Sequence, residues 1–114
     1  DYTRTLAALR EALERFAECV VIVWLPQVQL VEAAQLPQRL KAAVDAGGKK
    51  GWLHARLTVA QADGRGYGMT GSSVFIANPP HTLHDELQPV LPYLAQVLAQ
   101  FDGARSALDR SQKA

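Results

Sequence analysis

The stretch Cys19-Val20-Val21-Ile22-Val23-Trp24-Leu25 decides the fold class of this chain. It is apolar without alternation, β-branched at its centre and closed by Pro26. A run of this kind predicts a strand that is covered on both faces, as in the middle of a parallel sheet. A helix precedes it, because apolar residues recur at spacings of three and four: Leu6, Leu9, Leu13 and Phe16. A helix followed by a fully covered strand indicates an α/β domain.

The sequence after this strand predicts a second helix and a pair of antiparallel strands. We expect a short turn of helix or loop from Val28, and then a helix that begins near Pro37 and stops at Gly47-Gly48. Apolar and polar residues alternate over residues 51–61, which is typical of a half-buried strand. A glycine-rich connection leads to a second strand over residues 72–77, so the two strands are expected to form a β-hairpin with a long loop.

The string Asn78-Pro79-Pro80 ends that strand, since neither proline can donate a hydrogen bond to a sheet. Thr82 is the expected N-cap of a last helix, whose apolar stripe ends at Phe101. Residues 102–114 are polar and small, and we expect a frayed tail there. The predicted order is therefore α-β-α-β-β-α, with one domain over residues 1–101 and a sheet that is parallel except near one edge.

Composition excludes several classes of protein. The 114 residues carry a net charge of +1 and one cysteine, which excludes an internal disulfide or a thiolate metal cage. No apolar run approaches the roughly 20 residues that span a bilayer, so we expect no membrane partner. The pI near 8.1 gives no strong argument for nucleic-acid binding by the chain alone. Because the chain begins at Asp1 without an initiator Met, we expect that processing or truncation removed an upstream part.

The string Asn78-Pro79-Pro80-His81 has two interpretations. In many amino-methylating enzymes an Asn-Pro-Pro-aromatic motif at a strand end holds a flipped adenine, and its amide accepts a hydrogen bond from the exocyclic amine. Here the fourth residue is His, and no glycine-rich cofactor loop precedes the motif on a first strand. The structural interpretation, a strand end followed by a helix start, is therefore favoured.

The loop Gly64-Arg65-Gly66-Tyr67-Gly68 has the composition of a phosphate-binding loop, but it opens no helix and lacks the helix N-terminus that binds anions. We interpret it as a flexible hairpin loop with an exposed Arg65 and Tyr67. These side chains are suited to contact nucleic acid, the first by pairing with phosphate and the second by stacking on a base.

The other polar and reactive residues form no active site. His54, beside Arg56 on one face of its strand, is by default a packed or solvated strand residue. His81 and His84 lack the further ligands of a metal site, so we predict no metal. Cys19 opens an apolar strand and is expected to be inert.

Four strings occur in the order Trp24-Leu25-Pro26, Gly68-Met69-Thr70-Gly71-Ser72, Asn78-Pro79-Pro80 and Val90-Leu91-Pro92-Tyr93-Leu94. Together they resemble the C-terminal part of the RlmJ family, bacterial methyltransferases that modify an adenine amine in large-subunit (23S) ribosomal RNA. The second string, followed five residues later by the third, is the most specific part. The resemblance runs from about Asp1 to Leu98 and covers most of this chain but less than half of a family member.

The resemblance implies a cytoplasmic adenine-N6-methyltransferase that depends on S-adenosylmethionine and has ribosomal RNA as its partner. It also implies a Rossmann-like class I sheet, of which this chain is the C-terminal half. In the family, the cofactor site and the catalytic Asp-Pro-Pro-Tyr motif lie upstream of the position of Asp1-Tyr2. No catalytic or cofactor-binding residue is therefore expected in this chain, which alone is predicted to be inactive.

The family fold further predicts where the motifs lie. Its last strand is antiparallel and lies between its two predecessors, so residues 72–77 would carry Asn78 to the edge opposite the chemistry, where it is structural. Trp24-Leu25-Pro26 and the 62–68 loop are expected on the substrate side. The candidate RNA contacts are Trp24, Arg65 and Tyr67.

Without upstream strands, the edge of the strand at residues 20–24 would be bare, so it is predicted to pair with another chain or with the missing N-terminal half. An alternative function is a complete, non-catalytic α/β module that binds nucleic acid or protein through its sheet. A third possibility is that Asn78-Pro79-Pro80-His81 serves a minimal methyltransferase.

Overall fold

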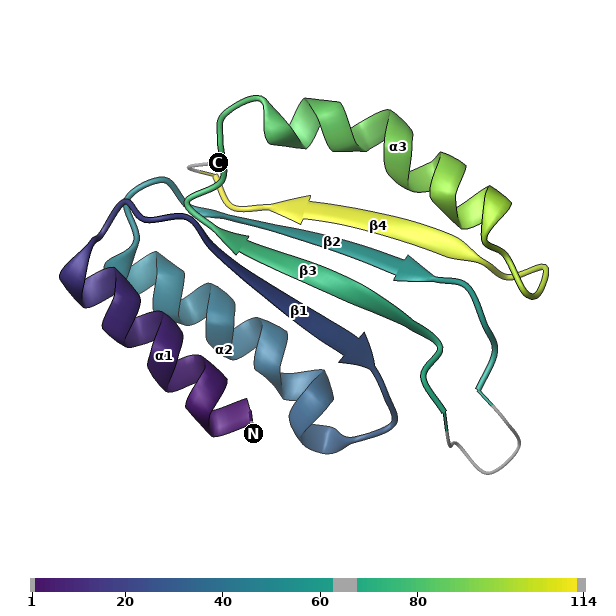
Figure 1. The fold of residues 1–114 in the computed structure, drawn as a ribbon, viewed down its shortest axis with the longest axis horizontal. Coiled ribbons are helices and arrows are strands. Elements are labelled where there is room, and N and C mark those ends of the chain that lie inside the picture. Colours follow the sequence, from purple (N-terminus) through teal and green to yellow (C-terminus); the bar gives the residue numbers. More distant parts are fainter. Residues whose placement is uncertain (1, 63–67, 113–114) are drawn as a thin grey trace.

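The computed structural model describes residues 2–62 and 68–112 of the chain (Figure 1). The described residues form three helices and four strands, in the order α-β-α-β-β-α-β. Their bounds are α1 (Tyr2–Arg15), β1 (Val21–Gln27), α2 (Val31–Gly47), β2 (Trp52–Thr58), β3 (Gly71–Ala77), α3 (Leu83–Val97) and β4 (Arg105–Arg110). No described helix is long and apolar enough to cross a membrane.

The strands form one sheet in the order β1-β3-β2-β4, and every neighbouring pair is antiparallel. Strand β3 lies between β1 and β2, with Ala77 opposite both Val21 and Trp52. The expected α/β class and the reversed strand over residues 72–77 are confirmed. The expectation of neighbouring parallel strands is wrong for the described sheet, because β3 separates the two strands that run in the same direction (Figure 1).

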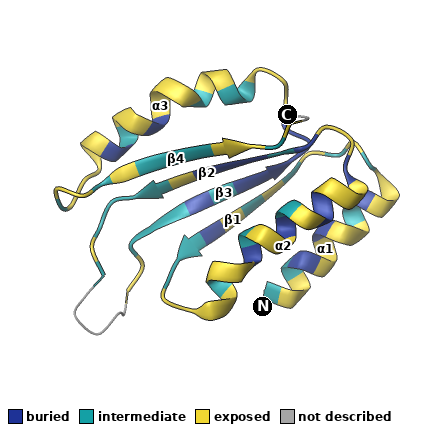
Figure 2. Cartoon of the chain, turned by 180° about the vertical axis from the view of Figure 1, so that it is seen from behind, coloured by how far each residue is buried: buried dark blue, intermediate teal, exposed yellow. Residues whose placement is uncertain are grey.

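Strand β1 lies at an edge of this sheet. The helices α1 and α2 cover one face, on which Leu25 is 6% exposed. Ile22 and Trp24 alternate to the other face and are 66% and 58% exposed. The expectation that both faces are covered is wrong, because α3 lies at the far end of the sheet, against β4 and β2 (Figure 2).

Helix α2 begins at Val31, and Pro37 lies inside it. Proline lacks an N–H and removes one hydrogen bond of the helix. The helix nevertheless continues, because Leu36 and Leu40 are 2% and 0% exposed in the core and their burial outweighs one lost bond. The predicted helix start near Pro37 is therefore wrong.

Strand β4 occupies part of the segment that the sequence predicts as a frayed tail, and that prediction is wrong for residues 105–110. The strand pairs with β2 along its whole length. Beyond it, the N–H of Ser111 donates to the carbonyl of Trp52 at 3.0 Å, and the N–H of Trp52 donates to Ser111 Oγ at 2.9 Å. Backbone pairing stabilises β4 although Leu108 is its only large apolar residue.

The main core lies between the helix pair α1–α2 and the half of the sheet formed by β1 and β3. Its most deeply buried side chains include Leu9, Leu40, Val44 and Phe75. Helix α3 packs on the other half of the sheet and buries Leu91 and Ala95. On the side of the sheet that faces α1 and α2, the strands β2 and β4 are left largely uncovered. The candidate site lies on this uncovered strip.

Candidate functional site

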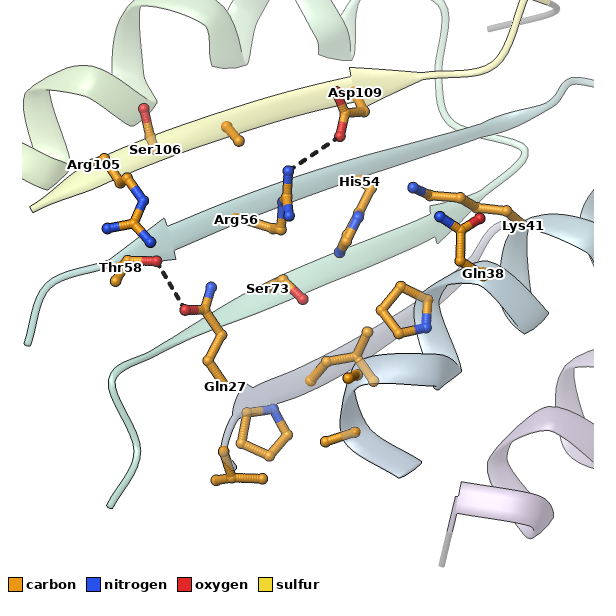
Figure 3. A pocket seen from close by; sticks show the side chains of 17 residues that line it. Gln27, Gln38, Lys41, His54, Arg56, Thr58, Ser73, Arg105, Ser106 and Asp109 are labelled. Carbon is orange, nitrogen blue, oxygen red and sulfur yellow. Dashed lines mark hydrogen bonds and ion pairs between the residues drawn. The ribbon is translucent and has the colours of Figure 1, made fainter. Parts of the chain in front are cut away.

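A pocket of about 570 Å³ opens between α2 and β4, and we call it the α2–β4 pocket (Figure 3). One wall is the first half of α2, which contributes residues from Ala33 to Lys41. The floor is formed by residues of β2, β3 and β4 whose side chains point to the same face of the sheet. Leu25 and Pro26 close the end beside β1. The pocket therefore exists because α2 covers only half of the sheet.

Cations from three elements line this pocket. Lys41 comes from α2, Arg56 from β2 and Arg105 from β4, and Asp109 is the single acidic residue among the described lining residues. Arg56 Nη2 lies 3.5 Å from Asp109 Oδ2, in an exposed ion pair. Lys41 Nζ lies 4.7 Å from the ring centroid of Trp52, a cation–π contact. Arg105 donates to the carbonyl of Gly103 at 3.3 Å, so its guanidinium keeps further N–H donors.

His54 lies on the floor of the pocket, where Figure 3 shows its ring between Arg56 and Lys41. The residue is 2% exposed, and neither ring nitrogen has a hydrogen-bond partner in the part of the chain that the structure describes. Burial is the largest cause that lowers the pKa of His54 from its ordinary 6.5 to about 4. The nearby charges of Lys41 and Arg56 lower it further, and Asp109 opposes them. At neutral pH the imidazole is therefore uncharged, with one N–H donor and one acceptor nitrogen.

The far end of the pocket is held by a small hydrogen-bond network. Thr58 Oγ1 donates to Gln27 Oε1 at 2.8 Å, and Thr70 Oγ1 lies 3.4 Å from the same oxygen. Gln27 Nε2 donates to the carbonyl of Ser72 at 3.4 Å. These bonds tie the carboxyl ends of β1 and β2 together across β3, so this end of the pocket has a fixed width.

Asn78 lies at the opposite end of the sheet and links three chain segments. Its Oδ1 accepts from the N–H groups of Lys49 and Lys50 at 3.1 and 2.8 Å. Its Nδ2 donates to the carbonyls of Ala17 and Cys19 at 2.8 and 2.7 Å. The amide thus has no free donor or acceptor with which to hold an adenine. The structural interpretation of Asn78-Pro79-Pro80-His81 is confirmed, and the minimal-methyltransferase interpretation of this motif is wrong.

The sequence-predicted RNA contacts do not meet in the α2–β4 pocket. Trp24 is exposed on the face of β1 that points away from α2. Arg65 and Tyr67 lie outside the described residues. Sequence reasoning missed His54 as a site residue, although alternation along its strand places it beside Arg56. The charges of α2 and β4 join them only through the tertiary fold, and the sequence gives no signal for β4.

No group of three or more His, Cys, Asp or Glu side chains with the geometry of a metal site occurs among the described residues. The described polar side chains of the pocket are three cations, one carboxylate and several neutral donors and acceptors.

Comparison with known protein families gives one match over almost the whole chain. The family described as ribosomal RNA large subunit methyltransferase D, RlmJ, matches residues 1–109. The chain belongs to this family. The match includes β1, β2, the reversed strand β3 and all of β4 except Arg110.

Two curated relatives carry the name ribosomal RNA large subunit methyltransferase J. The protein from Haemophilus influenzae is 33% identical over 98 residues, which are 86% of this chain and 33% of the relative. The protein from Escherichia coli is 31% identical over 94 residues, or 82% of this chain and 32% of the relative. The chain thus spans about a third of the length of these RlmJ relatives.

A solved structure has the same fold. The crystal structure of a protein from Legionella pneumophila superposes with a TM-score of 0.80 at 21% sequence identity. The match covers 98% of this chain and 39% of that protein. At this identity the likeness concerns the fold alone.

Proposed function

We propose that this chain is the C-terminal portion of an S-adenosylmethionine-dependent methyltransferase that modifies an adenine N6 amine in large-subunit ribosomal RNA. The observation that carries the proposal is the RlmJ family match over residues 1–109. The names of the curated relatives and the one-third share of their length support it. In this proposal the chain completes the sheet of a Rossmann-like enzyme, and the upstream part carries the cofactor site and the catalytic motif.

The residues of the α2–β4 pocket do not fit S-adenosylmethionine. Its sulfonium is a cation, and three cations line this pocket. Ribose hydroxyls are commonly held by a carboxylate, whereas Asp109 already pairs with Arg56. No step of the reaction is therefore assigned to this pocket, and the cofactor is proposed to bind the upstream part.

The proposed partner of β1 is the rest of the enzyme. The strand lies at the edge of the sheet, where one row of its backbone groups has no strand partner. Val20, Ile22 and Trp24 add an exposed apolar surface beside that edge. A further strand of the upstream part would pair with this edge and cover part of that surface.

Trp24 remains a proposed RNA contact, together with Arg65 and Tyr67. It is 58% exposed in the middle of β1, on the face that points away from α2.

The experiment that tests the proposal compares two proteins. The 114-residue chain is expected to bind no S-adenosylmethionine in a calorimetric titration. The same chain preceded by the upstream two-thirds of an RlmJ relative, joined at Asp1, is expected to bind the cofactor and to transfer labelled methyl groups to unmethylated ribosomal RNA. Tight cofactor binding by the short chain would contradict the assignment of the cofactor site to the upstream part.

A second candidate function, a non-catalytic nucleic-acid-binding module, is favoured by the cations of the α2–β4 pocket. The extended protein distinguishes the two functions. Transfer of methyl groups to RNA by the extended protein supports the enzyme. The module is supported if the 114-residue chain binds RNA while the extended protein folds but transfers no methyl group.

A further inference from the structure

The charge of the α2–β4 pocket is out of proportion to that of the chain. Three cations and one carboxylate line the pocket, whereas the whole chain carries a net charge of +1. The cations come from α2, β2 and β4 and line one pocket, with Arg56 between Arg105 and Lys41 (Figure 3). A concave surface lined by charges of one sign attracts ions of the opposite sign.

His54 is a second and independent observation at the same place. The residue is 2% exposed, and neither ring nitrogen has a hydrogen-bond partner among the described residues. Leaving a buried polar group unpaired destabilises a fold, and an apolar ring of similar shape would avoid this cost. A residue that breaks this rule is typical of a binding site, where a ligand provides the missing hydrogen bond.

The donor set fits a phosphate diester. A phosphate presents several oxygens that accept hydrogen bonds from different directions, and arginine forks pair with it in a bidentate way. Proteins that recognise single-stranded bases stack them on aromatic side chains. No Phe, Tyr or Trp is among the described residues that line this pocket. The pocket is therefore suited to the nucleic-acid backbone, which positions a substrate, and not to a base.

We propose that the α2–β4 pocket binds the phosphate backbone of RNA through Lys41, Arg56 and Arg105, which follow one another along the pocket, with His54 donating a hydrogen bond from its floor. The choice of RNA over another phosphate compound rests on the proposed function. The phosphate chemistry rests on the pocket alone.

Asp109 competes with the phosphate in this arrangement. Its carboxylate pairs with Arg56 at 3.5 Å, and both side chains are 49% exposed. An ion pair exposed to this extent is weak, so a phosphate can replace the carboxylate. Removing the negative charge of Asp109 is therefore expected to strengthen binding, a change that a damaged fold would not produce.

The test follows binding to the folded 114-residue chain by amide NMR, with inorganic phosphate in one arm and a single-stranded RNA of about ten nucleotides in the other. We expect both ligands to shift the amide signals of Lys41, His54 and Arg56, and RNA to bind more tightly. Arg105→Gln should weaken RNA binding about fivefold and lower the salt dependence by about one phosphate contact. Asp109→Asn should strengthen it about threefold.

The matched control is Arg39→Gln, which removes the same charge from an exposed position of α2 outside the pocket. It should change RNA affinity less than twofold. Equal loss in Arg39→Gln and Arg105→Gln would overturn the proposal, because general attraction would then explain the binding. Binding of inorganic phosphate without RNA would overturn the assignment to RNA. Neither result depends on methyl transfer, so the proposed function is tested separately.

His54 provides a readout that a purely structural residue would not give. An anion beside the imidazole stabilises its protonated form, so saturating phosphate should raise the pKa of His54. NMR of the ring nitrogens measures this change. His54→Phe should keep the fold and lose at least half of the phosphate affinity. Unchanged affinity in a folded His54→Phe variant would contradict the role of this side chain.

Discussion

At the scale of single residues, two buried polar side chains have opposite hydrogen-bonding states. Asn78 is 1% exposed, and its amide makes four hydrogen bonds to backbone groups of two loops. It also adopts a left-handed φ of 53°, which Asn tolerates better than most residues. His54 is buried to a similar degree and has no hydrogen-bond partner in the described chain. The first side chain therefore stabilises the fold, whereas the second leaves its hydrogen-bonding capacity unused.

Replacing Asn78 is expected to be severely destabilising. Asn78→Ala leaves two N–H groups and two carbonyls without this partner and should lower the free energy of unfolding by about 3 kcal/mol or more. Asn78→Asp keeps the acceptor and loses the donor, and Asn78→Gly loses the same four bonds as Asn78→Ala but adopts the left-handed backbone conformation without strain. Urea denaturation should place both Asn78→Ala and Asn78→Gly below the wild type, with Asn78→Ala the less stable of the two. Equal stability of Asn78→Gly and the wild type would mean that the four bonds contribute little.

The stability of the chain should depend on pH through His54. Its pKa is about 4 when folded and 6.5 when exposed, so between these values only the unfolded state takes up the proton. This contribution is complete above pH 6.5 and is lost as the pH falls towards 4, at up to about 1.4 kcal/mol per pH unit. Urea denaturation at pH 7 and pH 5 measures the loss. His54→Phe should remove this part of the pH dependence and be about 1 kcal/mol more stable at pH 7.

At the scale of helices and strands, patterns of side chains predicted most elements, and their failures have physical causes. Helix α1 follows a clear periodicity because one of its faces packs against the core, and β2 and β3 are rich in strand-forming residues although parts of both are buried on both faces. Strand β4 has almost no apolar pattern. Its pairing with β2 is made by backbone groups, which every sequence provides, so the side chains give no signal for it. Helix α2 continues through Pro37 because distant residues bury its sides. The cationic pocket combines both missed features, and so it was not predictable from the sequence.

The exposed apolar face of β1 is expected to be a contact surface. Ile22→Lys and Trp24→Lys change exposed residues and should alter the stability of the chain by less than about 0.5 kcal/mol each. Both should weaken association of the chain with a separately produced upstream part, measured by sedimentation velocity. Val31→Lys is the control, since Val31 is 71% exposed on α2. Equal association of all three variants would place the upstream part on another surface.

At the scale of the whole molecule, the uneven cover of the sheet explains both proposed contacts. Helices α1 and α2 cover the β1–β3 half of the sheet on one face, and α3 covers the β2–β4 half on the opposite face. The two uncovered areas are the outer face of β1, which is apolar, and the strip over β2 and β4, which is cationic. The first is the proposed contact for an upstream part, and the second is the proposed contact for RNA. A protein of this length accordingly presents two chemically distinct surfaces.

The place of β3 between β1 and β2 has a consequence for the synthesis of the protein. Both earlier strands pair with β3 and not with each other, so neither has its described strand partner until residues 71–77 have left the ribosome. Pairing over such long sequence separations is slow, and unpaired apolar strands are prone to aggregate. The nascent chain therefore passes through a stage in which β1 and β2 are exposed together. A translational arrest that holds residues 71–77 inside the ribosome should increase chaperone binding, whereas an arrest after these residues have left it should not.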